Sequence, residues 1–365
     1  MKEKSKPPAE WQRRYSGGKR GVPVNPPNRF DPREVVYDGD WLDTEPEAPL
    51  PQTQFLPDHS RTVLSHNESP DVAFNLSVNP YRGCEHGCAY CYARPTHEYF
   101  GLSAGLDFET RIFVKYRAAA LLTAELQRNG YRPEPIALSG NTDPYQPIER
   151  KLQLTRNILT VLRDFRHPVM IITKNALVTR DTDIFSEMAH YQLVRIFLSI
   201  NTLDARLCGK LEPRTSRPER RLEAIRRLAD AGIPVGVLMA PIIPALTDHE
   251  IPRILDAAYQ AGARFASYIV LRLPHGVKDI FTDWLQTHYP ERAFKVLQRL
   301  RDLRGGQLYR SEFGERMLGQ GNYARQIEQL FRATYHRLGY TMPPPLSTHH
   351  FRRGGAHQPT LFDRD

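Results

Sequence analysis

Residues 79–95 read NPYRGCEHGCAYCYARP and contain three of the four cysteines of this 365-residue chain. Cys84, Cys88 and Cys91 follow the spacing C-x3-C-x2-C, which places three thiolates on one short loop. Three thiolates can bind three corners of an iron–sulfur cubane and leave one iron without a protein ligand. The stretch therefore favours a [4Fe-4S] cluster as the group that this loop holds.

Zinc is the alternative metal for the same loop. A structural zinc site closes with four ligands, and the sequence offers His86 within the loop or Cys208 far downstream as the fourth. His86 lies so close to two of the cysteines that a tetrahedral site would be cramped. A lone cysteine such as Cys208 is more often a buried core residue than a ligand. Gly83 and Gly87 would let the backbone wrap closely around either metal group.

Downstream and upstream of the loop, short apolar runs alternate with amphipathic helical patterns at the spacing of β-α units. The six apolar runs are AFNLSV (73–78), PIALS (135–139), PVMIIT (168–173), LVRIFLSI (193–200), PVGVLMAP (234–241) and FASYIVLRL (265–273). Successive β-α units with right-handed crossovers form a parallel sheet. The sequence thus predicts an α/β fold, a partial (β/α)6 TIM-like barrel.

The barrel is expected to occupy residues 71–288, with further segments on either side. Residues 1–70 are rich in Pro and charge and show no sustained periodicity, so we expect an extended, largely irregular N-terminal arm. Residues 289–341 contain two more helical patterns and predict a C-terminal helical extension. Residues 342–365 are expected to form a flexible tail.

Composition limits the classes of protein to which the chain can belong. Its formal net charge of +9 and pI near 9.4 favour anionic partners, nucleic acid among them. Four cysteines in 365 residues do not make a disulfide framework, which is typical of a reducing compartment. No stretch approaches the roughly 20 apolar residues of a membrane span, and the N-terminus lacks a secretory signal. We therefore expect a cytoplasmic protein with no membrane contact.

The unusual residues fall where a barrel enzyme carries its chemistry. In such barrels the reactive groups lie on the loops that leave the C-terminal ends of the strands. The cysteine loop follows the first predicted strand. The loops after the other five strands contain GNTDPYQPIE, TKN, SINT, PIIP and LRLP. The sequence therefore places one site at this edge of the sheet.

Two features of the sequence resemble a known family. The pattern C-x3-C-x-aromatic-C, with Tyr90 as the aromatic residue, resembles the radical S-adenosylmethionine (SAM) superfamily. NPYRGCEHGCAYCYARPTHEY and GNTDPYQPIE are similar to a bacterial subfamily related to spore photoproduct lyase. The resemblance implies that SAM chelates the open iron of the cluster. It also implies that an external donor supplies an electron and that SAM is cleaved to a 5′-deoxyadenosyl radical.

The resemblance also implies which loop receives SAM. Where the superfamily has a Gly-Gly-Glu-like turn for the SAM amino group, this chain has Ser139-Gly140-Asn141-Thr142-Asp143. Asn141 or Asp143, together with Ser139, is implied as the partner, because an ammonium group needs oxygen acceptors. The alternative is an Asp-Pro turn that only starts the next helix.

Four more residues are candidates for SAM binding. Tyr90 is implied to pack on adenine, and Lys174, after the third strand, to face SAM. The alternative for Lys174 is a solvated lysine at a strand end. Ser199 and Asn201, after the fourth strand, are candidates for contacts with the ribose or carboxylate.

One departure from the lyase bears on the reaction. The lyase carries a hydrogen-donating cysteine in the loop after the second strand, where this chain reads Ala137-Leu138-Ser139-Gly140. Cys208 is the spare thiol, and Tyr145 and Tyr268 are alternative donors. The catalytic residue is therefore not assigned.

The C-terminal tail suggests a partner. Gln358–Phe362 reads QPTLF, which resembles the Q-x-x-L-F peptide by which bacterial DNA-processing proteins dock on the DNA sliding clamp. The alternative is a Leu-Phe pair that folds back on its own core. Together with the positive charge, this motif favours action on DNA, as in lesion repair. The alternatives are radical SAM modification of RNA or protein, and a non-catalytic zinc-stabilised nucleic-acid-binding module.

Overall fold

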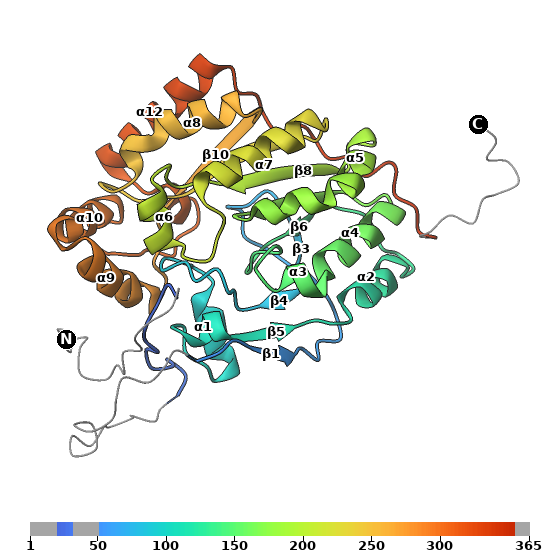
Figure 1. Cartoon of the computed structure of the whole chain (residues 1–365), viewed down its shortest axis with the longest axis horizontal. Helices are drawn as coiled ribbons and strands as arrows, with labels where there is room; N and C mark the ends of the chain where they lie inside the picture. Colours follow the sequence, from blue (N-terminus) through green and yellow to red (C-terminus); the bar gives the residue numbers. More distant parts are fainter. Residues whose placement is uncertain (1–19, 32–50, 355–365) are drawn as a thin grey trace, which may run out of the picture.

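The computed structural model describes residues 20–31 and 51–354 (Figure 1). Its main sheet has seven strands in the order β10-β9-β8-β7-β6-β3-β2. Six of these strands run parallel and coincide with the six predicted runs: β3 (Leu76–Val78), β6 (Ile136–Leu138), β7 (Val169–Thr173), β8 (Val194–Ser199), β9 (Val235–Ile242) and β10 (Phe265–Val270). The predicted six-unit α/β partial barrel is therefore confirmed.

A helix follows each parallel strand, and the helices after the first five of these strands lie over one face of the sheet (Figure 1). In the helix after β6, the buried residues Leu154, Ile158, Leu159 and Leu162 recur at the period of one helical face. The side chains of Ile158, Leu159 and Leu162 pack with the strands in one continuous core. The six helices are α2 (Ala118–Leu126), α4 (Leu154–Asp164), α5 (Thr182–His190), α7 (Pro218–Asp230), α8 (Ile251–Gln260) and α9 (Val277–His288).

Short helices sit in the connections, and longer ones extend the barrel at its C-terminal end. The connecting elements are η2 (Arg94–Phe100), α1 (Asp107–Thr110), α3 (Glu149–Leu152), η3 (Ala176–Asp181), α6 (Ala205–Leu211), η4 (Asp248–Glu250) and α11 (Glu315–Leu318). The helices expected between residues 289 and 341 are α10 (Pro290–Leu303) and α12 (Gly321–Leu338). α10 packs on α9, and α12 packs on α8.

Residues 51–70, assigned to the arm by the sequence, contribute two strands. β1 (Gln54–Pro57) pairs in parallel with β5 (Arg111–Val114), which also pairs with β4 (Tyr81–Arg82) in a separate small sheet. β2 (Leu64–His66) pairs antiparallel with β3 at the edge of the main sheet. β1, β2 and β4 lie outside any apolar run of the kind that predicted the three-residue strands β3 and β6, so only their partners identify them.

Residues 20–31 lie against the cysteine loop. Val22 and Val24 are buried, and the Leu106 backbone N–H donates to the Val24 carbonyl over 2.9 Å. The Gly21 N–H donates to Glu109 over 3.0 Å. A Cβ on Gly21 would lie 1.4 Å from the Gly87 carbonyl oxygen, so the two backbones touch. This part of the arm therefore packs directly on the predicted cluster loop.

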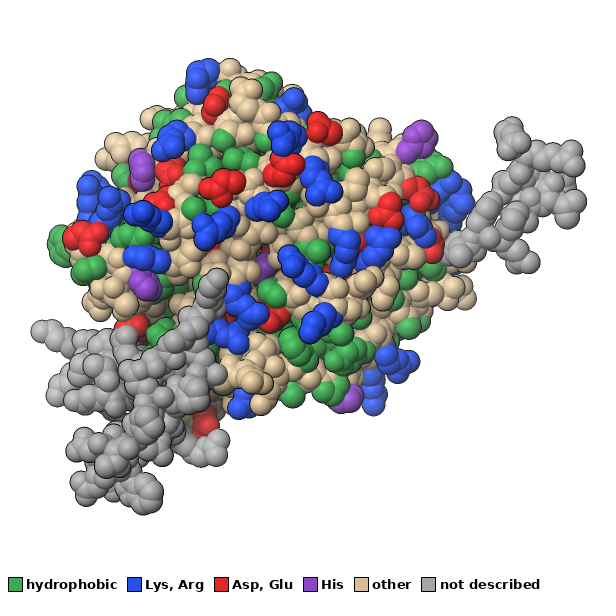
Figure 2. Space-filling model, viewed as in Figure 1, with side chains coloured by type: hydrophobic (Ala, Val, Ile, Leu, Met, Phe, Trp, Pro, Cys, Tyr) green, Lys and Arg blue, Asp and Glu red, His purple; other side chains and the backbone are tan. Residues whose placement is uncertain are grey.

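The surface carries many basic side chains. Figure 2 shows Lys and Arg spread among fewer acidic residues over the helical face. Within residues 20–31 and 51–354, no helix combines the length and the apolar character needed to cross a membrane.

Candidate functional site

The three cysteines of the loop lie close together with free thiols. Cys84 and Cys88 are buried, Cys91 is partly buried, and none of the three forms a disulfide. Gly83 has φ +81° and Gly87 has φ +69°, backbone conformations that favour glycine. A Cβ on Gly87 would lie 2.6 Å from a Glu109 carboxylate oxygen. The glycines are thus needed for the tight course of the loop.

A buried arginine holds the loop from the arm side. Arg94 is fully buried, and its Nε donates to the Cys88 carbonyl over 3.0 Å. Its Nη1 donates to the carbonyls of Ala104 and Gly105, and its Nη2 pairs with Glu109 over 2.6 Å. Because one guanidinium bonds three carbonyls on two stretches of backbone and also a carboxylate, the position of Cys88 depends on this contact.

The loop after β6 holds the opposite side of the cysteine loop. The Glu85 N–H donates to the Gln146 side-chain oxygen over 2.9 Å, and the Gln146 amide donates to the Gly83 carbonyl over 3.2 Å. The Glu85 carboxylate accepts from the Ile148 N–H and pairs with Arg214. The cysteines are therefore held in a frame of buried hydrogen bonds.

The cysteine loop opens onto a cavity of about 440 Å³ at the C-terminal edge of the sheet. Cys88 and Cys91 line one end of this cavity. Five of the six predicted SAM-binding residues also line it: Tyr90, Ser139, Asn141, Lys174 and Ser199. The structure thus brings together residues from the cysteine loop and from the ends of β6, β7 and β8.

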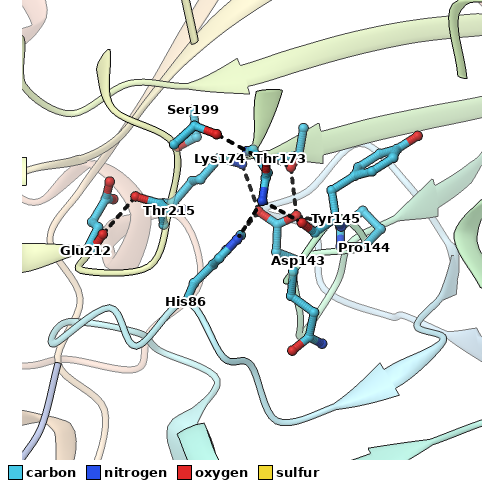
Figure 3. Close-up of polar contacts among 12 residues, drawn as sticks. His86, Asp143, Pro144, Tyr145, Thr173, Lys174, Ser199, Glu212 and Thr215 are labelled. Atoms are coloured by element: carbon cyan, nitrogen blue, oxygen red, sulfur yellow. Dashed lines mark hydrogen bonds and ion pairs between the residues drawn. The ribbon is translucent and has the colours of Figure 1, made fainter. Parts of the chain in front are cut away.

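Asp143, the sixth, does not line the cavity. One carboxylate oxygen accepts from the Thr173 hydroxyl (2.7 Å) and the Tyr145 N–H (2.9 Å). The other accepts from the Lys174 N–H (2.8 Å) and faces His86 Nδ1 at 3.4 Å (Figure 3). With these contacts Asp143 joins the end of β7 to the cysteine loop rather than facing a ligand.

His86 is likewise engaged away from the cavity. Burial would lower its pKa, but the charge of Asp143 and contact with Cys84 raise it. Burial would raise the pKa of Asp143, but His86 and the hydrogen bonds from Lys174 and Thr173 lower it. The two groups therefore form a buried ion pair.

The loop at residues 139–142 is shaped by a residue that the sequence analysis did not select. The Asn79 side-chain oxygen accepts from the backbone N–H groups of Gly140 (3.0 Å), Asn141 (2.9 Å) and Thr142 (3.4 Å). Ser139 has φ 121°, an unusual value for a non-glycine residue at this turn. Asn79 directly follows β3, so its position at the end of a strand was the signal by which the sequence could have identified it as a site residue.

Tyr90 is fixed by a buried ion pair that was also missed. Its hydroxyl donates to Glu212, and the same carboxylate pairs with Arg221. Glu212 and Arg221 are each 1% exposed. Burial raises the pKa of Glu212, but the charges of Arg221 and Lys174 lower it, so the carboxylate is ionised. Arg221 also donates to the Ser199 carbonyl over 2.7 Å, which ties Tyr90 to the end of β8.

Lys174 supplies a positive charge beside the cysteines. Its ammonium lies 5.9 Å from the centre of the Tyr90 ring, and within residues 20–31 and 51–354 it has no ion-pair partner. Burial lowers its pKa, but Cys88, Glu212 and Asp143 raise it above the usual value. The side chain therefore carries its charge at neutral pH and is available to an anionic ligand group.

The remaining candidates lie off the cavity wall. Asn201 is buried, and its amide nitrogen approaches the Tyr90 hydroxyl at 3.5 Å. Cys208, in α6, contacts Arg221 (3.5 Å) and Glu212 (3.7 Å). Tyr145 donates to Asp181 within the core. Tyr268, the other proposed hydrogen donor, packs on α12. No residue proposed as a hydrogen donor therefore borders the cavity.

The donor set suits a cluster with three protein ligands. Burial is the main cause that raises the pKa values of Cys88 and Cys91. The neighbouring cysteines raise these pKa values further, because the thiols lie close enough to interact electrostatically. Iron removes the proton of a thiol that it coordinates. His86 and Cys208, the candidate fourth ligands, both have other partners. Among the described residues no His, Cys, Asp and Glu side chains are grouped to hold a single metal ion. The fit of this site to a [4Fe-4S] cluster therefore rests on three neighbouring thiols, two of which line the cavity.

Comparison with known proteins identifies the family. The Radical SAM superfamily model matches residues 78–258. Rv2578c of Mycobacterium tuberculosis (H37Rv), an uncharacterized protein, is 37% identical over 242 residues, covering 65% of this chain and 70% of the relative. MJ0683 of Methanocaldococcus jannaschii, also uncharacterized, is 33% identical over 214 residues, covering 59% and 76%.

Solved structures show the same fold. Spore photoproduct lyase complexed with dinucleoside spore photoproduct aligns with a TM-score of 0.53 at 19% identity, covering 78% of this chain and 80% of the lyase. A lyase mutant with bound AdoMet (SAM) and the dinucleoside aligns with a TM-score of 0.52 at 18% identity and the same coverage. The family model, the relatives and the cysteine loop beside a barrel-edge cavity agree: the chain belongs to the radical SAM superfamily and is an enzyme of that superfamily.

Proposed function

We propose that Cys84, Cys88 and Cys91 hold a [4Fe-4S] cluster and that SAM binds in the adjoining cavity. The bound cluster, given an electron by an external donor, supplies reductive cleavage of SAM to a 5′-deoxyadenosyl radical. The observation that carries the proposal is the joint lining of one cavity by two of the thiols and by the unpaired ammonium of Lys174.

The residues of the cavity wall offer complementary partners for SAM. Lys174 can pair with its carboxylate, and the oxygens of Ser139 and Asn141 can accept from its ammonium. The Tyr90 ring, held by Glu212, offers an apolar face for adenine. Ser199 is placed for a polar contact with the ribose or the carboxylate. Asp143 acts through Lys174 and His86 as a positioning residue.

We propose nucleic acid as the substrate, with DNA lesion repair as the cellular role in the cytoplasm. The net charge of +9 supports a polyanionic substrate. The lyases of similar fold were solved with a dinucleoside lesion, which supports the same choice. RNA or protein modification is the alternative within the same chemistry.

The test is anaerobic reconstitution followed by turnover. We expect a brown protein with about four irons per chain. With dithionite and SAM it should form 5′-deoxyadenosine, and faster with ultraviolet-damaged DNA than with undamaged DNA, as measured by chromatography. A colourless protein with a single zinc, or an iron protein that forms no 5′-deoxyadenosine, would contradict the proposed chemistry. Equal rates with the two DNAs would contradict the proposed role in repair and leave the proposed SAM chemistry in place.

The sliding-clamp contact is a separate proposal. Gln358–Phe362 lies outside the described residues, so the argument is the sequence motif. We expect the full chain to bind immobilised sliding clamp and the double variant Leu361→Ala/Phe362→Ala to lose binding, because the two side chains would fill an apolar pocket. The double variant His349→Ala/His350→Ala, just upstream, is the control. Equal retention of the wild type and the Leu361/Phe362 variant would remove the clamp from the proposed function.

A further inference from the structure

The wall of the cavity carries a second cation that has no ion-pair partner among the described residues. Arg272 follows β10, and its guanidinium borders the cavity together with Tyr92 and Met317. Its Nη1 approaches the Met317 sulfur at 3.2 Å, a weak acceptor. Its Nε is buried without a hydrogen-bond partner among the described residues. A buried guanidinium nitrogen of this kind is costly unless a ligand completes its contacts.

No carboxylate of the described residues lines the cavity to balance this charge. The other arginine on the wall, Arg316, is already compensated, because it pairs with Asp71 and donates to Ser69. Lys174 belongs to the end of the cavity near the cysteines and is assigned to SAM. Arg272 is therefore left as the unpaired cation for a second ligand.

A neighbouring arginine adds to the positive potential. Arg304 is buried behind the wall, where it donates to the carbonyls of Leu271 and Glu315. Burial and then the charge of Arg272 lower the pKa of Arg304 to about 10. Two guanidinium groups that repel each other across the wall would both be stabilised by an anion in the cavity.

Arg272 is also held in a fixed orientation. Its guanidinium carbon lies 5.2 Å from the centre of the Tyr92 ring, a cation–π contact. The Tyr92 hydroxyl donates to the Gly140 carbonyl over 2.6 Å, so the ring itself is anchored to the loop after β6. Tyr92 remains 47% exposed, which leaves ring surface for a planar group.

We propose that Arg272 is the phosphate-binding residue of the substrate site and that the exposed part of the Tyr92 ring stacks with an adjacent base of a nucleic acid strand. This rests on the proposed function and names the substrate class for the same cavity. A planar guanidinium fork matches the oxygens of a phosphodiester. Hydroxyl and amide groups of Ser65, Asn67 and Ser69 line the same cavity and can donate to further backbone oxygens. The positive charge of the chain favours a polyanionic ligand, and the exposed Tyr92 ring favours one that carries planar bases.

The test is fluorescence anisotropy with fluorescein-labelled pentathymidylate and anaerobically reconstituted protein. We expect Arg272→Gln to weaken binding about tenfold and to reduce the slope of log affinity against log salt by about one. Arg272→Lys should be intermediate, because it keeps the charge but loses the fork. The salt slope separates a lost phosphate contact from a general disturbance of the wall.

Arg166→Gln is the matched control. Arg166 also stacks on a tyrosine, with its guanidinium carbon 4.0 Å from the Tyr191 ring centre, but it lies outside the cavity. The proposal is overturned if the wild type does not bind the oligonucleotide, or if Arg272→Gln binds it as the wild type or the Arg166 control does. It is also overturned if Arg272→Gln weakens binding of a labelled oligoglutamate peptide and not of the oligonucleotide. Because binding needs no turnover, this result is independent of whether SAM is cleaved.

Discussion

Cys88→Ala is expected to lose its iron–sulfur absorbance and to reduce SAM cleavage to background. Cys88 lies at the centre of the loop, its carbonyl is held by Arg94, and it borders the proposed SAM cavity. The two thiolates that remain are too few to hold a cubane, because the proposed cluster has three of its irons bound by cysteine. The measurement is iron content, visible absorbance and 5′-deoxyadenosine formation in protein reconstituted without oxygen.

Cys208→Ala is the matched control for this prediction. It removes the remaining thiol, which contacts Arg221 and Glu212 and does not border the cavity. Its iron content should equal that of the wild type. If Cys208→Ala lost iron as Cys88→Ala does, a fourth protein ligand would close the cluster, and SAM would have no iron to bind.

Glu212→Ala is expected to lower the free energy of unfolding by roughly 3–5 kcal/mol, because it leaves the buried Arg221 guanidinium without its counter-charge. It also releases the Tyr90 hydroxyl, so SAM affinity should fall with stability. The measurement is the denaturant midpoint at an unchanged m-value, together with SAM binding to the reconstituted protein.

Two comparisons isolate the buried charge. Glu212→Leu combined with Arg221→Met removes both charges and should be less destabilising than Glu212→Ala alone. Glu223→Ala breaks a surface pair with Arg226, whose side chain is 62% exposed, and should change stability by no more than about 1 kcal/mol. Equal effects of Glu212→Ala and Glu223→Ala on stability would mean that the buried pair contributes no more to the free energy of unfolding than the surface pair does.

Much of the architecture was predictable from local patterns. Strands β6 to β10 are short, continuous apolar runs, and the helices between them show a period of 3.6 residues, both of which a short window of sequence reveals. The cysteine spacing is equally local, because all three sulfurs lie on one loop. β1, β2 and β4 were not predictable, since strands this short exist only through their partners β5 and β3.

The residues of the candidate site likewise divide into those that the sequence could predict and those that it could not. Position after a strand, together with the resemblance to the superfamily, selected Ser139, Asn141, Lys174 and Ser199, because parallel strands end at one edge of the sheet. The same rule selected Asp143, whose carboxylate turns toward His86 and the end of β7. Strand position specifies where a backbone lies, and it does not specify where a side chain points.

The sequence by itself determined the fold class, the three cysteines proposed as cluster ligands and the edge of the sheet that carries the candidate site. Only the tertiary structure decided that Glu212 and Arg221 fix Tyr90, that Asn79 shapes the loop after β6, and that Arg272 has no ion-pair partner among the described residues. The physical reason is that periodicity and loop spacing are local properties of a chain. A hydrogen bond such as that between Tyr90 and Glu212, which lie 122 positions apart in the sequence, exists only once the strands have been packed side by side.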